Sequence, residues 1–475
     1  MILLLIWPAT AAPEALSLKE LWQPTSIAAD PVLIKQYSIN GFQIKEVFFP
    51  GRPQSGQATR IFGYYCYPDH FAPLPALLIA HGGGGSADIK TALRWAGYGY
   101  AVLVIDLPGK GKQRRHSRST GPDMEVKNLL NTADPANNYL IFAVTAARNG
   151  IDFLAKQPEV DRNRIGMLGL SWGGVLTLLT NGQEPRLKAA VNVFGAGFIP
   201  EGCTWQELFE AKTGREKQAW DKLLDPSNFL ASQRSPILFI TGTNDHCYYL
   251  HTFQKSYGRV KAEKQYYLVP NLRHQFLPGT AAVAKAWFDR HLKAKNKFPA
   301  INLIYGREPG GVTIAAEVKG GSKDAKVQFY YASGGASGWT EKQWRTRPVK
   351  LSSGKYNFYI PDYLIDPEIV FFVNATDKEQ ASSTLVRSLF RLALDNGEKS
   401  YAVSAPVSEQ YNHKAPYLVL DRFKMPKDPK LVYSPSQEAY LINPLREPPE
   451  GLLSKWLHFL KVRQVSLIAP RVLDK

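Results

Sequence analysis

The stretch Arg164-Ile-Gly-Met-Leu-Gly-Leu-Ser-Trp-Gly-Gly174 decides the fold. Its apolar first half predicts a buried strand, its second half carries the pattern G-x-S-x-G, and the apolar segment Val175–Leu179 predicts a helix. Strand, sharp turn and helix in this order are typical of a nucleophile elbow. Glycines on both sides of Ser171 let strand and helix pass closely while the serine adopts a strained backbone conformation. The stretch therefore predicts a reactive hydroxyl at a helix N-terminus; the alternative is a tight turn whose serine does no chemistry.

Short apolar runs alternate with helical patterns on both sides of this stretch, from residue 76 to residue 293. Predicted strands cover Ala76–Ala80, Tyr100–Asp106, Arg164–Leu168, Ala189–Phe194, Pro236–Thr241 and Gln265–Val269, after two earlier strands at Phe42–Phe49 and Arg60–Tyr67. Predicted helices cover Ala87–Ala96, Tyr139–Gln157 and Ala281–Leu292, and a helical lid is predicted over residues 203–224. The alternation predicts an α/β fold with a mostly parallel sheet and helices on both of its faces.

The pattern changes at Lys295–Pro299. Strands without helices follow, at Val312–Val318, Lys326–Tyr331, Tyr356–Ile360 and Ile369–Asn374. We therefore expect an α/β domain over residues 41–295 and a small antiparallel β-sandwich over residues 300–390. Residues 12–40 are expected to form a leader on the surface of the α/β domain. Residues 391–475 are rich in proline, and their only predicted element is an amphipathic helix at Leu452–Val462.

A serine becomes a good nucleophile only when a base takes its proton, and an acid commonly orients that base. In folds that carry a nucleophile elbow, the chain order is serine, acid, histidine. Asp245 and His274 each follow a predicted strand, where loops line the ligand crevice of a parallel sheet. Asp225 is an alternative acid, disfavoured because it precedes its strand. The sequence predicts that Ser171, Asp245 and His274 form one site; otherwise the last two are ordinary loop residues.

Four glycines in His81-Gly-Gly-Gly-Gly85 follow the predicted strand Ala76–Ala80. Their backbone N–H groups can approach a ligand closely, and such a loop supplies an oxyanion donor beside the N–H of the residue after the nucleophile. The alternative is a flexible glycine loop. His81 is expected to support this loop rather than to act as the base. His246 adjoins the predicted acid and His291 lies on a predicted helix, so both are weaker candidates for the base.

Four motifs together resemble those of the acetyl xylan esterase and dienelactone hydrolase-related α/β-hydrolase family: His81–Gly85, Asp106–Gly109, Gly169–Gly174 and Gly242–Asp245. The resemblance covers residues 40–293 and implies an α/β-hydrolase fold. It also implies a serine esterase without cofactor or metal, which cleaves a small-molecule or carbohydrate ester through an acyl-enzyme. Deacetylation of an acetylated carbohydrate is the implied reaction.

Carried over by position, the resemblance makes Ser171 the nucleophile, Asp245 the acid and His274 the base. It makes the N–H groups of Trp172 and of Gly82 or Gly83 the oxyanion hole. The chain departs from the family at the histidine, where an arginine precedes it instead of the more usual glycine or proline. The doubled glycine after Trp172 also resembles prolyl oligopeptidase-like peptidases, but no propeller repeats precede the predicted domain.

An alternative from another class is a carbohydrate-binding protein with an inactive hydrolase domain. Retention of serine, acid and histidine in the family's order argues against it.

The distribution of basic residues and the spacing of the cysteines and histidines argue against a nucleic-acid-binding protein and against a metal site. The chain has 475 residues and a formal net charge of +17, but its basic residues are spread along the chain without a nucleic-acid-binding motif. A basic surface is therefore a better interpretation than a nucleic-acid site. The basic segment Lys110–His116 is expected to be a solvated loop, with contact to an anionic part of a substrate as the alternative. The cysteines and histidines lack zinc-ligand spacing, so we expect no metal.

The first residues resemble the end of a signal peptide. An apolar run ends in Ala9-Thr-Ala11, which fits cleavage after Ala11, although no basic residues precede the run. Residues 1–11 therefore predict export to the periplasm or secretion, and no apolar run reaches the ~20 residues needed to span a membrane. Cys203 and Cys247 follow neighbouring predicted strands. An oxidising compartment would let them form a disulfide; otherwise both are free thiols.

Overall fold

The structure is a computed structural model that describes residues 17–24, 30–69, 73–110, 117–295, 297–320, 325–333, 338–365, 368–393, 399–403 and 418–419. The predicted signal peptide, the basic segment after Lys110 and the predicted helix Leu452–Val462 lie outside the described residues. Among the described residues, no helix has the length and apolar character needed to cross a membrane.

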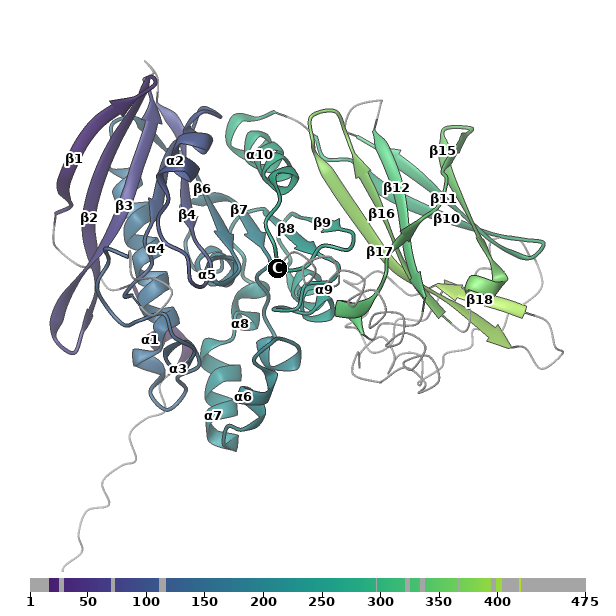
Figure 1. Ribbon diagram of the computed structural model, residues 1–475, viewed down its shortest axis with the longest axis horizontal. Helices are drawn as coiled ribbons and strands as arrows, with labels where there is room; N and C mark the ends of the chain where they lie inside the picture. The colour runs from purple at the N-terminus through teal and green to yellow at the C-terminus, as the bar shows by residue number, and fades with distance from the viewer. Residues whose placement is uncertain are drawn as a thin grey trace, which may run out of the picture.

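A nine-stranded sheet organises the first part of the described chain (Figure 1). Its strands lie in the order β1-β2-β3-β5-β4-β6-β7-β8-β9. They are β1 (Val32–Ile39), β2 (Phe42–Gln54), β3 (Gln57–Pro68), β4 (Leu74–Ala80), β5 (Ala101–Ile105), β6 (Val160–Leu170), β7 (Leu187–Val193), β8 (Ile237–Gly242) and β9 (Lys264–Val269). The strands from β5 to β9 in this order are parallel to one another, whereas β1, β2 and β3 pair antiparallel. The mostly parallel sheet expected from the sequence is confirmed.

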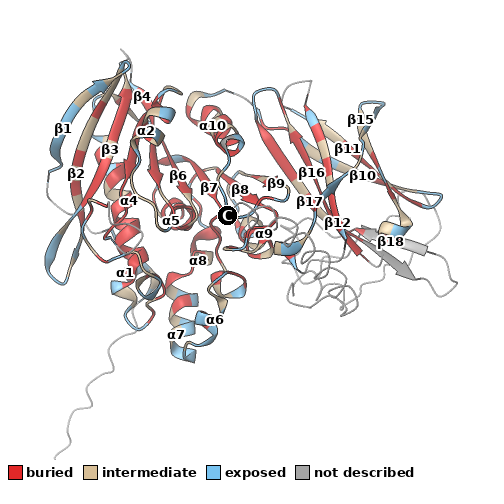
Figure 2. Cartoon of the chain, in the orientation of Figure 1, coloured by how far each residue is buried: buried red, intermediate tan, exposed pale blue. Residues whose placement is uncertain are grey.

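Helices cover both faces of this sheet because its central strands are apolar on both sides. The helices are α1 (Leu18–Leu21), α2 (Ile89–Ala96), α3 (Val126–Leu129), α4 (Tyr139–Ala155), α5 (Trp172–Asn181), α6 (Gln206–Glu210), α7 (Gly214–Ala219), α8 (Ser227–Leu230), α9 (Leu250–Arg259) and α10 (Pro278–Lys293). On β4, Leu78 packs with α4 and α5 on one face, while Leu77 packs with α2 and α10 on the other. Figure 2 shows the resulting buried centre as red strands and red inner helix faces.

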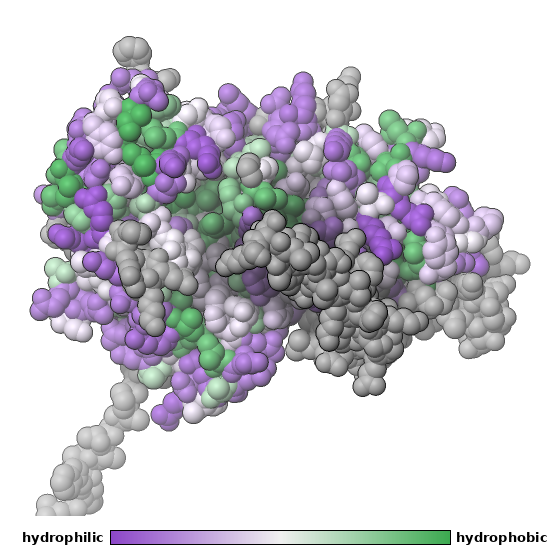
Figure 3. Space-filling model, viewed as in Figure 1, coloured by the Kyte–Doolittle hydropathy of each residue, from purple (hydrophilic) through white to green (hydrophobic). Residues whose placement is uncertain are grey.

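The predicted leader contributes a strand to the sheet. β1 pairs antiparallel with β2 through a tight turn at Asn40 and Gly41, where both residues have positive φ. The boundary predicted after residue 40 therefore falls in the turn of a hairpin, and residues 32–39 belong to the sheet. Val32 and Leu33 are exposed at this edge of the sheet, so their apolar side chains carry no burial pattern that would mark a strand. In Figure 3, green hydrophobic residues reach the surface along the left edge, where β1 lies.

Two antiparallel sheets form the second part of the described chain. The first has the order β10-β11-β15-β14 and the second the order β13-β12-β16-β17-β18-β19. Their strands are β10 (Ala300–Glu308), β11 (Gly311–Lys319), β12 (Lys326–Ser333), β13 (Arg345–Thr346), β14 (Lys350–Ser352), β15 (Lys355–Pro361), β16 (Glu368–Thr376), β17 (Ser382–Ala393), β18 (Lys399–Val403) and β19 (Leu418–Val419). A buried cluster that includes Ile314, Phe329, Phe358 and Phe371 fills the space between the two sheets. The predicted β-sandwich is confirmed.

The sandwich extends further than the sequence indicated. β17 ends at Ala393, and β18 and β19 lie within residues 391–475, for which no strand was predicted. Tyr401 and Val403 on β18 are buried in the same cluster as Phe329, so these residues complete the sandwich core. Alternation over a strand of only five residues is too short a signal to predict an element.

The sandwich packs against β9, the edge of the nine-stranded sheet opposite to β1 (Figure 1). The backbone N–H of Leu268 on β9 donates to Thr384 Oγ1 at 3.0 Å, and Asn374 Nδ2 donates to the carbonyl of Leu268 at 2.9 Å. Phe372 and Trp344 of the sandwich belong to the same buried cluster as the helices of one sheet face. One continuous apolar core therefore joins the two parts.

Candidate active site

Ser171 stands at the turn between β6 and α5. Its φ of 58° and ψ of −117° are strained for a residue with a side chain. A Cβ atom on Gly169 would overlap the carbonyl of Gly173, so strand and helix pass too closely for any larger residue at position 169. The backbone N–H of Ser171 donates to the carbonyl of Val193 at 2.8 Å and fixes the turn to the neighbouring strand. This geometry projects the hydroxyl from the carboxyl end of the sheet, as the elbow pattern predicts.

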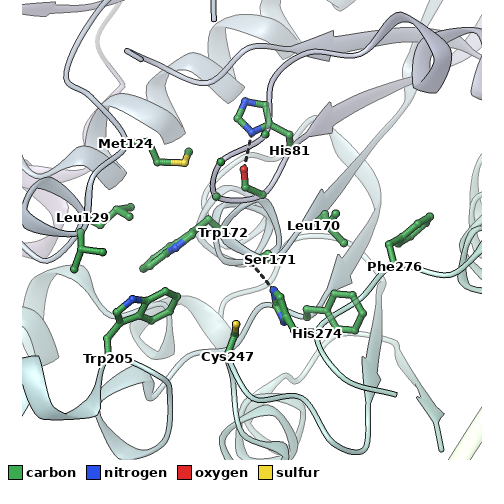
Figure 4. Close-up of a pocket in the computed structure, with 16 residues that line it drawn as sticks. His81, Met124, Leu129, Leu170, Ser171, Trp172, Trp205, Cys247, His274 and Phe276 are labelled. Carbon is green, nitrogen blue, oxygen red and sulfur yellow. Dashed lines mark hydrogen bonds between the residues drawn. The ribbon is translucent and has the colours of Figure 1, made fainter. Parts of the chain in front are cut away.

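His274 lies beside this hydroxyl, in the loop that follows β9 (Figure 4). Its Nε2 is 2.8 Å from Ser171 Oγ, and its Nδ1 is 2.8 Å and 3.0 Å from the two carboxylate oxygens of Asp245. A carboxylate accepts hydrogen bonds, so Nδ1 carries the proton and Nε2 is left with a lone pair toward the serine. The structure thus brings the three residues predicted from the sequence into one hydrogen-bonded chain.

Asp245 is held by its own loop. It is 0% exposed, and its Oδ1 accepts the backbone N–H groups of Cys247 at 2.8 Å and Tyr248 at 3.0 Å. Thr241 Oγ1 at the end of β8 donates to Oδ2 at 3.3 Å. These donors fix the direction in which the carboxylate meets His274.

The alternative acid, Asp225, serves a different place. Its carboxylate accepts the backbone N–H groups of Phe198, Ile199 and Ser227 and the indole N–H of Trp220. It therefore anchors the helical segment 203–224, and its hydrogen bonds give it a structural role at the base of that segment.

Aromatic rings fix the plane of the His274 imidazole. The ring of Phe194 lies 4.9 Å from that of His274, and the ring of Tyr248 lies 6.0 Å away. Phe194 is buried with a φ of 66°, an unusual conformation for a bulky residue. Neither residue was predicted for the site. Phe194 was assigned to the end of a strand, and a positive φ at a phenylalanine leaves no mark in a sequence.

The glycine loop lies directly against the nucleophile. A Cβ atom on Gly82 would be 3.0 Å from the Cβ of Ser171, and one on Gly83 would be 3.1 Å from the Trp172 indole. Only glycine leaves room for a substrate oxygen between this loop and the start of α5. The backbone of Gly82 and Gly83 therefore lies close to Ser171 and Trp172. Their role in an oxyanion hole stays a prediction.

His81 supports this loop. The backbone N–H of Leu107 donates to His81 Nε2 at 3.1 Å, so Nε2 must be unprotonated and Nδ1 carries the proton. Nδ1 then donates to the carbonyl of Gly82 at 2.8 Å (Figure 4). The neutral imidazole ties the glycine loop to the segment after β5, which matches the supporting role expected for this residue.

The two remaining candidates for the base do not contact the serine. His246 is exposed, with its ring 6.1 Å from that of His274. His291 lies on α10, where its ring packs 4.3 Å from that of Trp287. Burial lowers the pKa of His291 to about 4.

A pocket of about 470 Å³ opens above Ser171. Its wall is mainly apolar and aromatic and includes Met124, Phe194, Trp172, Trp205, Cys247 and Phe276. Trp205 comes from the helical segment predicted as a lid, and its ring lies 5.1 Å from that of Trp172. Figure 4 shows these two indoles side by side, across the pocket from Phe276. The pocket therefore suits a small acyl ester beside an aromatic surface.

The cysteines are free thiols. The backbone of Cys203 pairs with that of Tyr248, not with that of Cys247, in an isolated antiparallel β-bridge. The disulfide considered from the sequence is not formed in the structure. Burial raises the pKa of the Cys203 and Cys247 thiols to about 12, so near neutral pH neither competes with the serine as a nucleophile.

In the described part of the chain, Asp245, Cys247 and His274 bring three potential metal-ligand atoms within 4.8 Å of one another. The aspartate and the histidine already hydrogen-bond each other, and the histidine also meets Ser171. A metal on these residues would displace the hydrogen bonds on which the serine depends.

The chain is similar in sequence to several known proteins. A model of the acetyl xylan esterase family (AXE1) matches residues 19–292. Acetyl esterase Axe7A of Xylanibacter ruminicola is 25% identical over 253 residues, which cover 49% of this chain and 56% of that protein. The uncharacterized peptidase YuxL of Bacillus subtilis is 28% identical over 246 residues, which cover 46% of this chain and 35% of that protein. The chain therefore spans about half the length of Axe7A and less of YuxL.

A solved structure shares the fold. Acetyl xylan esterase 1 from Thermoanaerobacterium sp. JW/SL YS485 superposes with a TM-score of 0.50 at 21% identity, over 57% of this chain and 92% of that chain.

Proposed function

Because the chain belongs to the acetyl xylan esterase family, we propose that it is a serine esterase that removes acetyl groups from an acetylated carbohydrate. The observation that carries the proposal is the hydrogen-bonded chain from Ser171 Oγ through His274 to Asp245. Such a chain of groups performs acyl transfer from esters or amides. The family match favours the ester.

In the first half of the proposed reaction, Ser171 Oγ attacks the ester carbonyl carbon while His274 Nε2 takes the hydroxyl proton. The backbone N–H groups of Trp172 and of Gly82 or Gly83 stabilise the oxyanion of the tetrahedral intermediate. Asp245 stabilises the imidazolium that forms. The imidazolium then gives its proton to the departing alcohol, the C–O bond to that alcohol breaks, and an acetyl-serine remains.

In the second half, a water molecule attacks the acetyl-serine while His274 again accepts the proton. Collapse of the second intermediate breaks the bond to Ser171 Oγ, returns the proton to that oxygen from His274 and releases acetic acid, which ionises to acetate in solution. The wall of the pocket supports a small acyl group, and the indoles of Trp172 and Trp205 offer a flat surface against which a sugar ring can pack.

The test combines active-site labelling with a substrate panel. Purified full-length protein is treated with a fluorophosphonate probe beside the Ser171→Ala variant, and acetate release is measured on acetylated xylo-oligosaccharides and on 4-nitrophenyl acetate. Labelling that depends on Ser171, together with acetate release, supports the proposal. Labelling without ester cleavage would contradict it. Absence of labelling in the wild type would indicate the carbohydrate-binding alternative with an inactive site.

A serine peptidase of the prolyl oligopeptidase-like kind is the second candidate, favoured by the doubled glycine Gly173-Gly174. The same preparation is offered Pro-containing dipeptide anilides. Cleavage of the anilides that exceeds cleavage of the acetyl esters would favour the peptidase. Export, predicted from residues 1–11, remains a separate prediction, tested by the N-terminal sequence of the mature protein.

A further inference from the structure

A short segment of the sandwich reaches the loops that carry Asp245 and His274. We call residues 339–344, which lie between β12 and β13 in the chain, the sandwich arm. Asn244 Nδ2 donates to the carbonyls of Thr340 at 3.1 Å and Lys342 at 2.6 Å in this arm. Asn271 is bound twice to Trp344: its Nδ2 donates to the Trp344 carbonyl at 2.9 Å, and its Oδ1 accepts the Trp344 N–H at 2.8 Å.

These two asparagines lie close in the chain to Asp245 and His274 of the proposed triad. Asn244 directly precedes Asp245, and Asn271 lies three residues before His274. The two loops are also joined to each other, because Thr243 Oγ1 accepts the Asn271 N–H at 2.7 Å and the Asn244 N–H donates to the Leu272 carbonyl at 3.0 Å. A shift of either asparagine would therefore move the acid relative to the base.

The arm itself is firmly packed. Trp339 and Trp344 are 5% and 4% exposed, and their rings stack with centroids 6.4 Å apart and an interplanar angle of 6°. Trp344 also contacts Phe372 of β16 at 4.9 Å between ring centroids. Both tryptophans belong to the buried cluster that continues into the α/β domain. The hydrogen bonds from the loops therefore end on a backbone that is held from both domains.

Asn271 has a backbone conformation that needs such a partner. Its φ of 56° lies in the left-handed region, which asparagine tolerates better than most residues but which is still disfavoured. The paired hydrogen bonds to Trp344 stabilise this conformation at the turn that leads into His274.

We propose that Asn271 and Asn244 are positioning residues through which the β-sandwich holds the loops of His274 and Asp245 in register for the proton transfer. The α/β domain supplies the groups that react, and the sandwich arm fixes the distance between two of them. Since proton transfer requires heavy atoms within about 2.6–3.2 Å, a small displacement of either loop lowers turnover without removing a reacting group.

The test rests on the proposed esterase activity and compares three full-length variants. Asn271→Gly keeps the positive φ available and removes both hydrogen bonds to Trp344. Asn244→Ala removes the bonds to Thr340 and Lys342, together with the bond that Thr243 Oγ1 donates to Asn244 Oδ1 within the same loop. The matched control is Thr384→Ala. It also removes a hydrogen bond between the two domains, but this bond comes from Leu268 on β9 and not from a catalytic loop. Each variant is assayed for kcat and KM on 4-nitrophenyl acetate across pH, and for its melting temperature.

Asn271→Gly and Asn244→Ala are each expected to lower kcat by about 10- to 100-fold with KM changed less than about twofold. Their pH profiles should also change. The pH profile of kcat/KM depends on the groups that exchange the proton in the free enzyme, so a displaced loop should alter it. Thr384→Ala should lower the melting temperature but keep the kcat and the pH profile of the wild type.

Two results would overturn the inference. In the first, the asparagine variants keep the wild-type kcat and pH profile. In the second, all three variants lose kcat in proportion to their loss of melting temperature, which would show a general effect of domain docking. If Asn271→Gly does not fold, Asn244→Ala gives the same readouts. If the wild-type protein hydrolyses no ester, the proposed esterase function is wrong. This outcome is distinct from the two results above, which contradict only the positioning role of the asparagines.

Discussion

Ser171 Oγ and His274 Nε2 lie 2.8 Å apart although 103 positions separate the two residues in the chain. The serine follows β6 and the histidine follows β9, and two further strands, β7 and β8, lie between them in the sheet. The loop after β9 therefore has to reach back across the carboxyl ends of its neighbours to meet the serine. It does so beside the β8 loop, which carries Asp245.

The first prediction concerns the serine and its base. Ser171→Ala or His274→Ala should lower kcat for 4-nitrophenyl acetate by at least about a thousandfold with little change in KM, because both groups act in the transition state. His291→Gln on α10, remote from Ser171, is the matched histidine control and should keep wild-type turnover. Near-normal kcat in a folded His274→Ala protein would assign the base elsewhere.

The second prediction tests whether Asp245 acts through its carboxylate charge or only through the size of its side chain. Asp245→Asn should keep the loop but present an amide to His274 Nδ1, which favours the wrong tautomer and lowers kcat by about 10⁴-fold. Stopped-flow or steady-state assays on the same ester measure this loss. An Asp225→Asn variant, altered at the base of the helical segment, is expected to lower the melting temperature with little effect on kcat. A larger loss of kcat in Asp225→Asn than in Asp245→Asn would reverse the assignment of the acid.

The third prediction tests the glycine loop. His81→Ala removes the hydrogen bond to the Gly82 carbonyl and should lower kcat by about tenfold or more, because the oxyanion donors lose their fixed position. Gly82→Ala should do so more strongly, since its new Cβ would lie only 3.0 Å from the Ser171 Cβ. Gly279→Ala offers a control, because no atom lies within 4 Å of the Cβ it would add. Equal kcat in Gly82→Ala and Gly279→Ala would count against the oxyanion role.

The fourth prediction concerns stability in acid. Burial lowers the pKa of His251 to about 4, whereas the unfolded chain has the usual value near 6.5, so the folded state favours the neutral imidazole. Its contribution to stability is present above pH about 6.5 and is lost as the pH falls toward about 4. His291 has the same depressed pKa and the same sign. Melting temperatures of the double variant His251→Gln/His291→Gln should therefore fall less steeply over this window than those of the wild type. Parallel curves would show that neither histidine is linked to folding.

The fifth prediction concerns the boundary near Lys295. Trp344 and Phe372 share a buried cluster with the α/β domain, so calorimetry should give one cooperative transition for the whole chain. A chain ended after Lys295 would uncover the β9 edge and lose the sandwich arm, and it should aggregate or turn over ester poorly. A soluble truncated protein with wild-type kcat would show that the predicted domains over residues 41–295 and 300–390 are independent.

Much of this arrangement could be predicted from the sequence, for identifiable reasons. Central parallel strands such as β4 are buried on both faces and therefore appear as continuous apolar runs. The elbow around Ser171 needs glycines at fixed positions, and the acid and the histidine follow strand ends. Each of these requirements restricts which residue types can occupy the positions concerned, so it can be recognised in the sequence.

Other parts left no such mark. Val32 and Leu33 on β1 are exposed, so this edge strand lacks a burial pattern, and the short β18 offers too few residues for one. The positive φ of Phe194 depends on tertiary packing around His274. The sandwich arm meets Asn244 through backbone carbonyls, which every residue possesses, and the contact spans 96 and 98 positions of the chain. A sequence alone does not show which carbonyl such an amide finds.

The location of the sandwich arm has a consequence for the order of biosynthesis. A ribosome completes residues 1–295 before it begins the sandwich, and domains generally fold as units from the N-terminus during synthesis. The serine, the acid and the histidine would thus all have emerged while Asn244 and Asn271 still lacked their partners at Thr340, Lys342 and Trp344. Competence for hydrolysis is then acquired late, once the sandwich, whose core extends to Val403, has been synthesised and has docked. On the proposed function, a nascent chain would stay catalytically weak until the sandwich has docked against the loops of Asp245 and His274.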